Sequence, residues 1–158
     1  MSVIDIDLAM RHLLAEPDDQ LLIEAQLAAA EEAAAQFLQR RFFADSDALQ
    51  EAKSGIAARM AAVRLLYDAA KVSADVIDDL GDRCRLREQA RQAYGDALED
   101  IDKDAYGILI NPAITAACLL KLGHLFANRE EVVTGIIATE LPQASKSLLM
   151  PYRIRMGV

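Results

Sequence analysis

Apolar residues recur along most of this chain at the spacing of α-helices. Pro17 separates a short first helix from a longer second one, which the pattern places at residues 19–42. In the second helix Leu22, Ala29 and Phe37 recur at helical spacing, and small residues dominate one side. Another helix can therefore approach this one closely.

From Ser46 onward the apolar residues follow a repeat of seven, which is typical of two helices wound around each other. Gly81, flanked by aspartates, predicts the turn between them. We therefore expect residues 46–106 to form an antiparallel helical hairpin, with arms of about 40 to 50 Å at 1.5 Å per residue. The alternative is that these helices fold back into a plain bundle. The repeat consists of Leu49, Ile56, Val63, Ala70 and Ile77, with Met60, Tyr67 and Ala74 between them.

Another helix begins at Asn111-Pro112, an N-cap followed by proline at the first helical position. Over residues 113–126 apolar side chains occupy almost every face, so this helix must be buried all round. Because the body has few helices, we expect a neighbouring subunit to supply part of that burial. Pro151 ends a last short helix, and we expect the tail from Tyr152 onward to be extended or disordered in the isolated chain.

The sequence thus predicts an all-α protein, in which a small helical bundle body carries a long antiparallel helical hairpin insertion. The 158 residues include only 7 glycines and 4 prolines, and residues 132–139 are the only candidate strand. One domain accounts for this length. We expect its helical body to consist of residues 1–45 and 107–158, and the insertion to consist of residues 46–106.

The net charge of −8 argues against direct nucleic-acid binding, because contacts to phosphates need clustered lysines and arginines. The local basic group at Arg83, Arg85, Arg87 and Arg91 is typical of a solvated helix face. We therefore expect no sequence-specific nucleic-acid partner. An acidic surface suits a partner that carries basic patches.

The sequence gives no sign of export or of a membrane span. Cys84 and Cys118 lie far apart in different helices and are typical of reduced thiols in a cytoplasmic protein. The N-terminus lacks the basic and apolar regions of an export signal. The apolar segment 113–127 is interrupted by polar residues and falls short of the roughly 20 residues that cross a bilayer.

Candidate catalytic and metal-binding residues are sparse. His124 has no second histidine near it, and Cys118 lies on a different face of the same helix, whereas metal ligands on one helix are about three or four residues apart. Paired carboxylates such as Asp78-Asp79 have no calcium-binding loop beside them and indicate helix caps. No phosphate-binding or nucleophile motif occurs in the sequence. We therefore expect no enzyme activity, catalytic residue, metal or cofactor.

The C-terminal third carries several motifs at fixed spacing: I-x-x-A-x-L-L-x-x-x-H-L-F-x-N-R-E from Ile114, then Leu141-Pro142, then L-L-x-P-Y-R ending at Arg153. This pattern resembles the head–tail connector (head-completion adaptor) proteins of tailed bacteriophages and prophages. The helix at residues 19–42, with its Phe37-Leu38-Gln39-Arg40-Arg41, is similar to the second helix of that family. The stretch between is longer than in compact members, so the chain resembles a longer branch with a helical insertion.

This resemblance implies a structural role. Subunits of that family form a ring that docks beneath the portal protein at the capsid vertex after DNA packaging and joins head to tail. The expected partners are further copies of this chain, the portal protein and downstream head-completion or tail proteins. The expected location is the head–tail junction of the virion, preceded by the cytoplasm of the bacterial host. The insertion leaves open which surface meets the portal.

The resemblance and the apolar helix together predict a set of interface residues. Arg129 offers a rigid fork of donors suited to a carboxylate across an interface. From the residues alone, a solvated helix end with local ion pairs is an equal alternative, because Glu130 and Glu131 follow directly. The predicted set is Leu119, Leu122, Phe126, Asn128, Arg129, Pro151, Tyr152 and Arg153. We expect the last three to anchor a tail that rearranges on docking.

A second class of protein also fits this sequence. A small cytoplasmic helical regulator or chaperone-like binding protein would dimerise through the coiled-coil hairpin. Its main interface would be residues 46–106 rather than the apolar helix that begins at Asn111.

Overall fold

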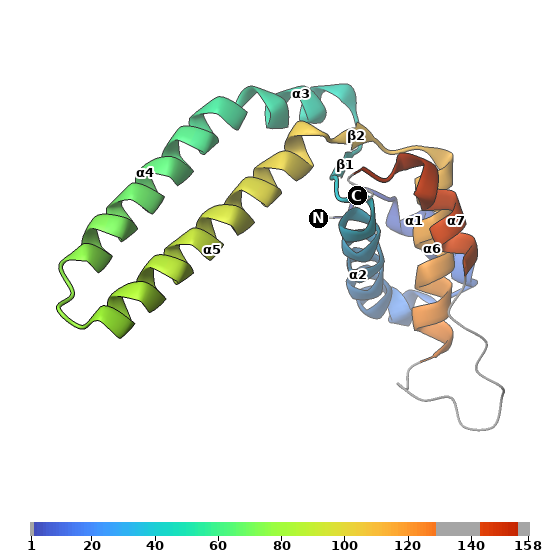
Figure 1. Ribbon diagram of the computed structural model, residues 1–158. Coiled ribbons are helices and arrows are strands. Elements are labelled where there is room, and N and C mark those ends of the chain that lie inside the picture. The colour runs from blue at the N-terminus through green and yellow to red at the C-terminus, as the bar shows by residue number, and fades with distance from the viewer. Residues whose placement is uncertain (1, 129–142, 155–158) are drawn as a thin grey trace. The chain divides into compact units, whose positions relative to one another are not determined.

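The computed structural model describes residues 2–128 and 143–154 (Figure 1). Helices dominate this part of the chain, so the predicted all-α class is confirmed. The candidate strand at residues 132–139 lies outside the described residues. The helices are α1 (Ile6–Leu13), α2 (Gln20–Leu38), α3 (Ser46–Ser54), α4 (Ile56–Asp75), α5 (Leu80–Ala105), α6 (Pro112–Ala127) and α7 (Gln143–Leu149), with short 3-10 helices at Pro17–Asp19 and Met150–Tyr152.

The chain divides into two compact units. The first unit, which we call the body, comprises Met1–Ser46 and Ile108–Val158. The second, the α4–α5 unit, comprises Asp47–Gly107. Each is described below by itself.

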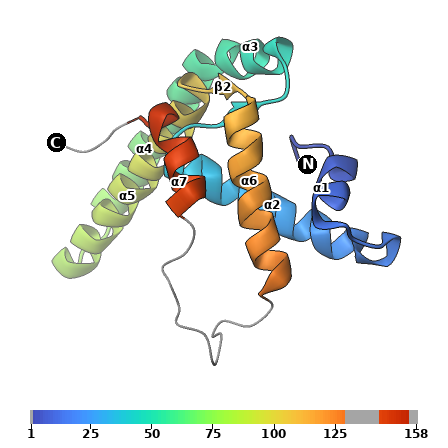
Figure 2. The ribbon, with the colours of Figure 1, turned by 90° about the vertical axis from the view of Figure 1, so that its right-hand side faces the viewer.

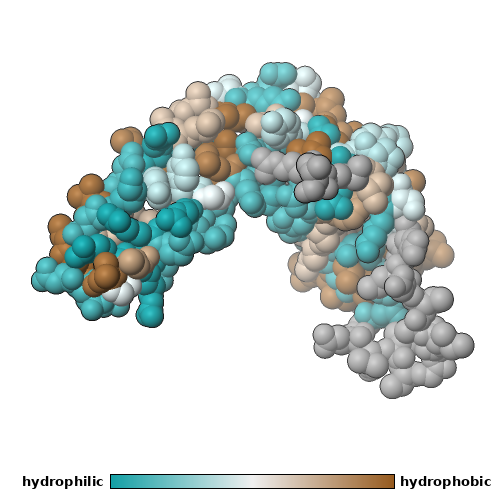
Figure 3. Space-filling view, in the orientation of Figure 1, coloured by the Kyte–Doolittle hydropathy of each residue, from teal (hydrophilic) through white to brown (hydrophobic). Residues whose placement is uncertain are grey.

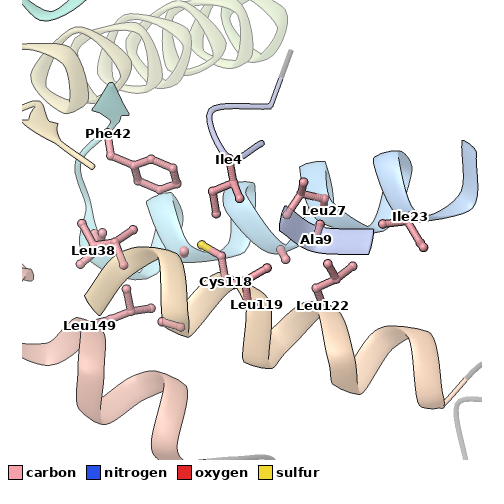
Figure 4. Packing of buried hydrophobic residues seen from close by; sticks show 14 residues of the cluster. Ile4, Ala9, Ile23, Leu27, Leu38, Phe42, Cys118, Leu119, Leu122 and Leu149 are labelled. Carbon is pink, nitrogen blue, oxygen red and sulfur yellow. The ribbon is translucent and has the colours of Figure 1, made fainter. Parts of the chain in front are cut away.

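The body is built around the packing of α2 against α6. Figure 2 shows α6 crossing α2, with α1 and α7 on either side. Ala30, Ala34 and Ala117 are buried in this core, and their small side chains let the two helices approach closely. Larger buried side chains of α2 and α6 belong to the same core, and Figure 4 labels most of them. They are Ile23, Leu27, Leu38, Ile114, Cys118 and Leu122.

The buried face of α2 differs from the face that the spacing of Leu22, Ala29 and Phe37 indicated. The structure buries Ile23 and Leu27 completely, whereas Leu22 is 38% exposed. Alanine is spread around this helix, so two neighbouring faces both have helical apolar spacing. The larger Ile and Leu side chains decide which one is buried, because they remove more apolar surface from water.

The body consists of two segments of the chain. A small pair of parallel strands, which the sequence pattern did not predict, joins them. Strand β1 (Phe42–Phe43) pairs with β2 (Ile108–Leu109), with Phe42 opposite Ile108. The Ile110 amide donates to the Phe43 carbonyl oxygen at 2.8 Å. This bridge fixes, side by side, the two points at which residues 47–107 leave and rejoin the body.

In the α4–α5 unit, α4 and α5 run in opposite directions along each other (Figure 1). The Tyr67 and Tyr94 rings stack at 4.7 Å between centroids, so the predicted heptad seam includes a real contact between the helices. The first arm is broken rather than continuous, because α3 ends before Gly55 and α4 begins after it. The turn also lies earlier than expected: Asp79 caps α5, and Gly81 falls in its first turn.

This second unit has a thin apolar core. Ala74 and Ile101 are its only buried hydrophobic side chains among the described residues. It also holds a buried carboxylate, Asp104, whose Oδ2 accepts from the Arg59 guanidinium at 2.5 Å. The same guanidinium reaches Asp100 at 3.3 Å. These contacts tie α4 to α5 near the end of the unit that adjoins the body in the chain.

A buried carboxylate also fixes the N-terminal segment to the body. Glu31 of α2 is only 8% exposed. Its Oε1 accepts from the Ser2 hydroxyl at 2.6 Å and from the Ile4 amide at 2.8 Å, and both carboxylate oxygens accept from the Val3 amide at 3.1 Å. Glu31 follows Leu27 by four residues and so lies on the buried face of α2. A charge at such a position requires partners, and the backbone of residues 2–4 supplies them.

We predict that Glu31→Ala lowers the free energy of unfolding by about 1–3 kcal/mol, because it leaves buried amides without an acceptor. Urea unfolding followed by circular dichroism measures this change. Glu32→Ala is the matched control, since Glu32 is exposed on the same turn of α2 and its replacement should cost well under half as much. Equal losses for the two variants would contradict the account.

Candidate functional site

The α6 helix begins as the sequence predicts. The Asn111 side chain accepts from the amides of Ala113 and Ile114, both at 3.0 Å, and Pro112 occupies the first turn. The Thr115 hydroxyl donates to the Asn111 carbonyl oxygen at 3.1 Å. This cap satisfies amides of the first turn and fixes the residue at which the helix begins.

The inner face of α6 is buried within the chain itself, and an outer stripe stays accessible. We call Ala116, Leu120 and Ala127 the α6 outer stripe. They follow one another at intervals of four and seven residues, so they share one face. Leu120 is 40% exposed and Ala127 is exposed. Gly123, which lies between Leu120 and Ala127 on the same face, is next to α1: a Cβ there would lie 3.8 Å from Nε2 of His12.

The predicted interface residues of α6 fall into two groups. Leu119 is 8% exposed and Leu122 is fully buried, so these two shape the helix from inside the core. Phe126 is half-buried and packs against the same core. Asn128 ends the helix: its side-chain amide donates to the His124 carbonyl oxygen at 2.9 Å and lies 3.1 Å from Nδ1 of that ring. Arg129 lies outside the described residues.

As far as residue 154 the tail is attached to the body rather than disordered, and Arg153 has extended backbone. The Tyr152 carbonyl oxygen accepts from Arg40 at 3.2 Å, and the Ile154 amide donates to the Leu38 carbonyl oxygen at 3.2 Å. The Arg153 guanidinium lies 4.9 Å from the centre of the Phe37 ring, within range of a cation–π contact. These contacts attach the tail to the C-terminal end of α2, whereas the preceding Pro151 is exposed.

A groove of about 440 Å³ lies between α2, α6 and α7. Its apolar lining includes Ala33, Phe37 and Leu149, and its polar lining includes Lys121 and Lys146. His124 and Ser145 also line it, and no described acidic side chain does. The groove therefore presents apolar surface with positive charge beside it, although the whole chain carries a net charge of −8. Its chemistry complements an apolar segment that carries negative charge.

The two cysteines occupy opposite environments and are both free thiols. Cys84 is exposed on α5, whereas Cys118 is fully buried on α6. Desolvation, and secondarily the nearby negative charge of Glu31, raises the pKa of Cys118 to about 12. Cys118 is therefore protonated and unreactive at neutral pH, and it serves as a small apolar side chain in the core.

Within residues 2–128 and 143–154, no three histidine, cysteine or acidic side chains are placed to hold a metal ion. None of the described helices combines the length and apolar character needed to cross a membrane.

Two further features were missed by the sequence analysis, namely the Glu31 clamp and the Arg59–Asp104 pair, and both are structural contacts.

Comparison with known proteins adds no relationship: no family model, curated protein or solved structure matches the chain.

We predict that one thiol per chain reacts quickly with Ellman's reagent under mildly alkaline conditions, because Cys84 is exposed to the reagent. The second thiol should react only after denaturation, since Cys118 is buried and its pKa is about 12. Cys84→Ser should remove the fast phase and leave the slow one. Two thiols reacting at the same rate in the native chain would show that the environment of Cys118 is described wrongly.

Proposed function

We propose that this chain is a head–tail connector subunit of a tailed bacteriophage or prophage. It forms a ring beneath the portal protein at the capsid vertex and joins head to tail. One observation carries the proposal furthest. The segments that resemble the family, in α2, in α6 and in α7 with the tail, pack together in one body. The long stretch that departs from the family lies in a separate unit.

A ring of identical subunits needs two different complementary surfaces on each subunit. The body offers two candidates, the α6 outer stripe and the groove between α2, α6 and α7. Leu120 of the stripe is 40% exposed, and the groove is lined by side chains of α2, α6 and α7. With roughly a dozen copies, weak contacts between neighbours act together. The buried Leu119 and Leu122 then support the interface by positioning α6, while Leu120 makes the contact.

The charge of the chain suits a channel through which DNA passes. With a net charge of −8 the subunit does not trap the phosphate backbone. Partners are further copies of this chain, the portal protein and later head-completion or tail proteins. The place of action is the head–tail junction of the virion. The contacts of Tyr152 and Arg153 with α2 represent the tail before docking, and we expect docking to rearrange them.

The regulator that dimerises through its hairpin remains a second candidate. It is favoured by one observation, which is that α4 exposes Leu65 and Leu66 by 71% and 72%. Surfaces of that kind mark protein interaction sites.

We predict that Leu120→Glu prevents the chain from decorating the cognate portal ring, because it puts a charge into the neighbour contact of α6. Native mass spectrometry and negative-stain images of mixtures with the portal measure binding and ring closure. Leu21→Glu is the control, since Leu21 is 81% exposed in the first turn of α2. Undiminished decoration by the Leu120 variant would overturn the assigned contact. A wild-type chain that never binds the portal would overturn the connector proposal.

A further inference from the structure

The surface of α4 that faces away from α5 is apolar and uncovered. We call Ala58, Ala62, Leu65, Ala69, Val72 and Val76 the α4 outer stripe. Leu65 is 71% exposed, Val72 66% and Val76 75%. Figure 3 shows hydrophobic side chains along this outer edge, at the left of the view.

The spacing of the stripe indicates what covers it. Its members follow one another at intervals of four, three, four, three and four residues. That repeat of seven keeps one seam facing a neighbouring helix along its whole length. The α4 helix therefore carries two such seams, one occupied by α5 and one vacant. Alanines at three of the six positions allow a second helix to approach closely.

Charged residues beside the stripe identify which helix fits. Arg64, Asp68, Lys71 and Asp75 follow one another at intervals of four, three and four residues, so they line one flank of α4. Their signs alternate. The four positions are symmetric about the midpoint between residues 69 and 70. When the row is reversed about this midpoint, each positive charge falls on the position of a negative charge, and each negative charge on that of a positive one. A reversed copy of α4 is therefore its electrostatic complement.

We infer that the α4 outer stripe, over its residues Leu65, Ala69, Val72 and Val76, packs antiparallel against the same residues of a second copy of this chain. The two-fold axis passes between residues 69 and 70. In this arrangement equivalent flanks face each other, which places Arg64 opposite Asp75 of the second copy and Asp68 opposite Lys71 of the second copy. Such a contact is isologous, with the same surface used on both subunits.

The charges already have local contacts that this arrangement keeps. The Asp75 carboxylate pairs with Arg87 of α5, and the Lys71 ammonium lies 5.3 Å from the centre of the Tyr67 ring. Both side chains remain exposed at the edge of the stripe. A parallel pair of α4 helices would instead place this flank against the opposite flank, where Leu66 and Ser73 offer no matching charge. The inference does not rest on the connector proposal, because it involves a different unit from the ring surfaces.

The charge pairs are tested by exchanging their signs. Asp68→Lys brings two lysines together at each of the two symmetry-related pairs in the dimer, and Lys71→Asp brings two aspartates together in the same way. Each variant alone should self-associate about tenfold more weakly than the wild type in sedimentation velocity. An equimolar mixture should restore association, because both cross pairs are then attractive. The double variant on one chain should restore it too. Local effects within a single helix cannot produce rescue on mixing.

The register is tested by cross-linking in a Cys84→Ser background, which removes the exposed native thiol. Ala69→Cys places a thiol next to the two-fold axis and should give covalent dimers under mild oxidation. Ala62→Cys is the control: in the inferred register the two new thiols lie roughly 20 Å apart along the helix axis at 1.5 Å per residue. This readout holds whether or not the chain also forms a ring. Absence of the Ala69 cross-link, equal cross-linking at Ala62, or no rescue on mixing would overturn the inference.

Discussion

The close packing of α2 against α6 is the contact on which the rest of the body depends. Small side chains at Ala30, Ala34 and Ala117 let the helices meet, and Leu27 and Leu122 are buried in the same core. The other parts of the body attach to this pair. α1 contacts both helices, α7 packs mainly on α6, and the tail binds the end of α2. A larger side chain at one of the alanines would push apart the surfaces that hold all of them.

Polar groups then make the arrangement specific. In the body, the Glu31 carboxylate collects donors from residues 2–4 and fixes the N-terminal segment. In the α4–α5 unit, which has few buried apolar side chains among the described residues, Asp104 binds Arg59. In both cases a buried charge tolerates few geometries, because any displacement leaves it without partners. Each unit thus has a site that favours one relative placement of its own elements.

Local signals in the sequence predicted part of this structure. Asn111 and Pro112 start α6 where capping rules place it, and the heptad seam includes the Tyr67–Tyr94 contact. Long-range effects were not visible. The face of α2 depends on which apolar side chains pack best, and the β1–β2 bridge joins residues 66 positions apart, Phe42 and Ile108. The partner of Glu31 is largely backbone, which carries no residue signature.

The candidate surfaces illustrate the same limit. Apolar content marked α6 as unusual, but only its rotation shows that Leu122 points inward while Leu120 stays accessible. In α4 the second seam was hidden in the sequence by the first, because both are rows of apolar residues with the same period. In the structure α5 covers one of these two rows, and the side chains of the other row are exposed. The chain therefore combines a well-packed body with a helical unit that exposes an apolar surface.

Hydrogen–deuterium exchange on the intact chain, at a low and a high protein concentration, tests this account most directly. The account predicts that amides in the middle of α2 and α6 exchange slowest and do so equally at both concentrations. Amides of α4 should exchange faster at low concentration and gain protection as the concentration rises. Slow, concentration-independent exchange throughout α4, matching that of α2 and α6, would contradict it.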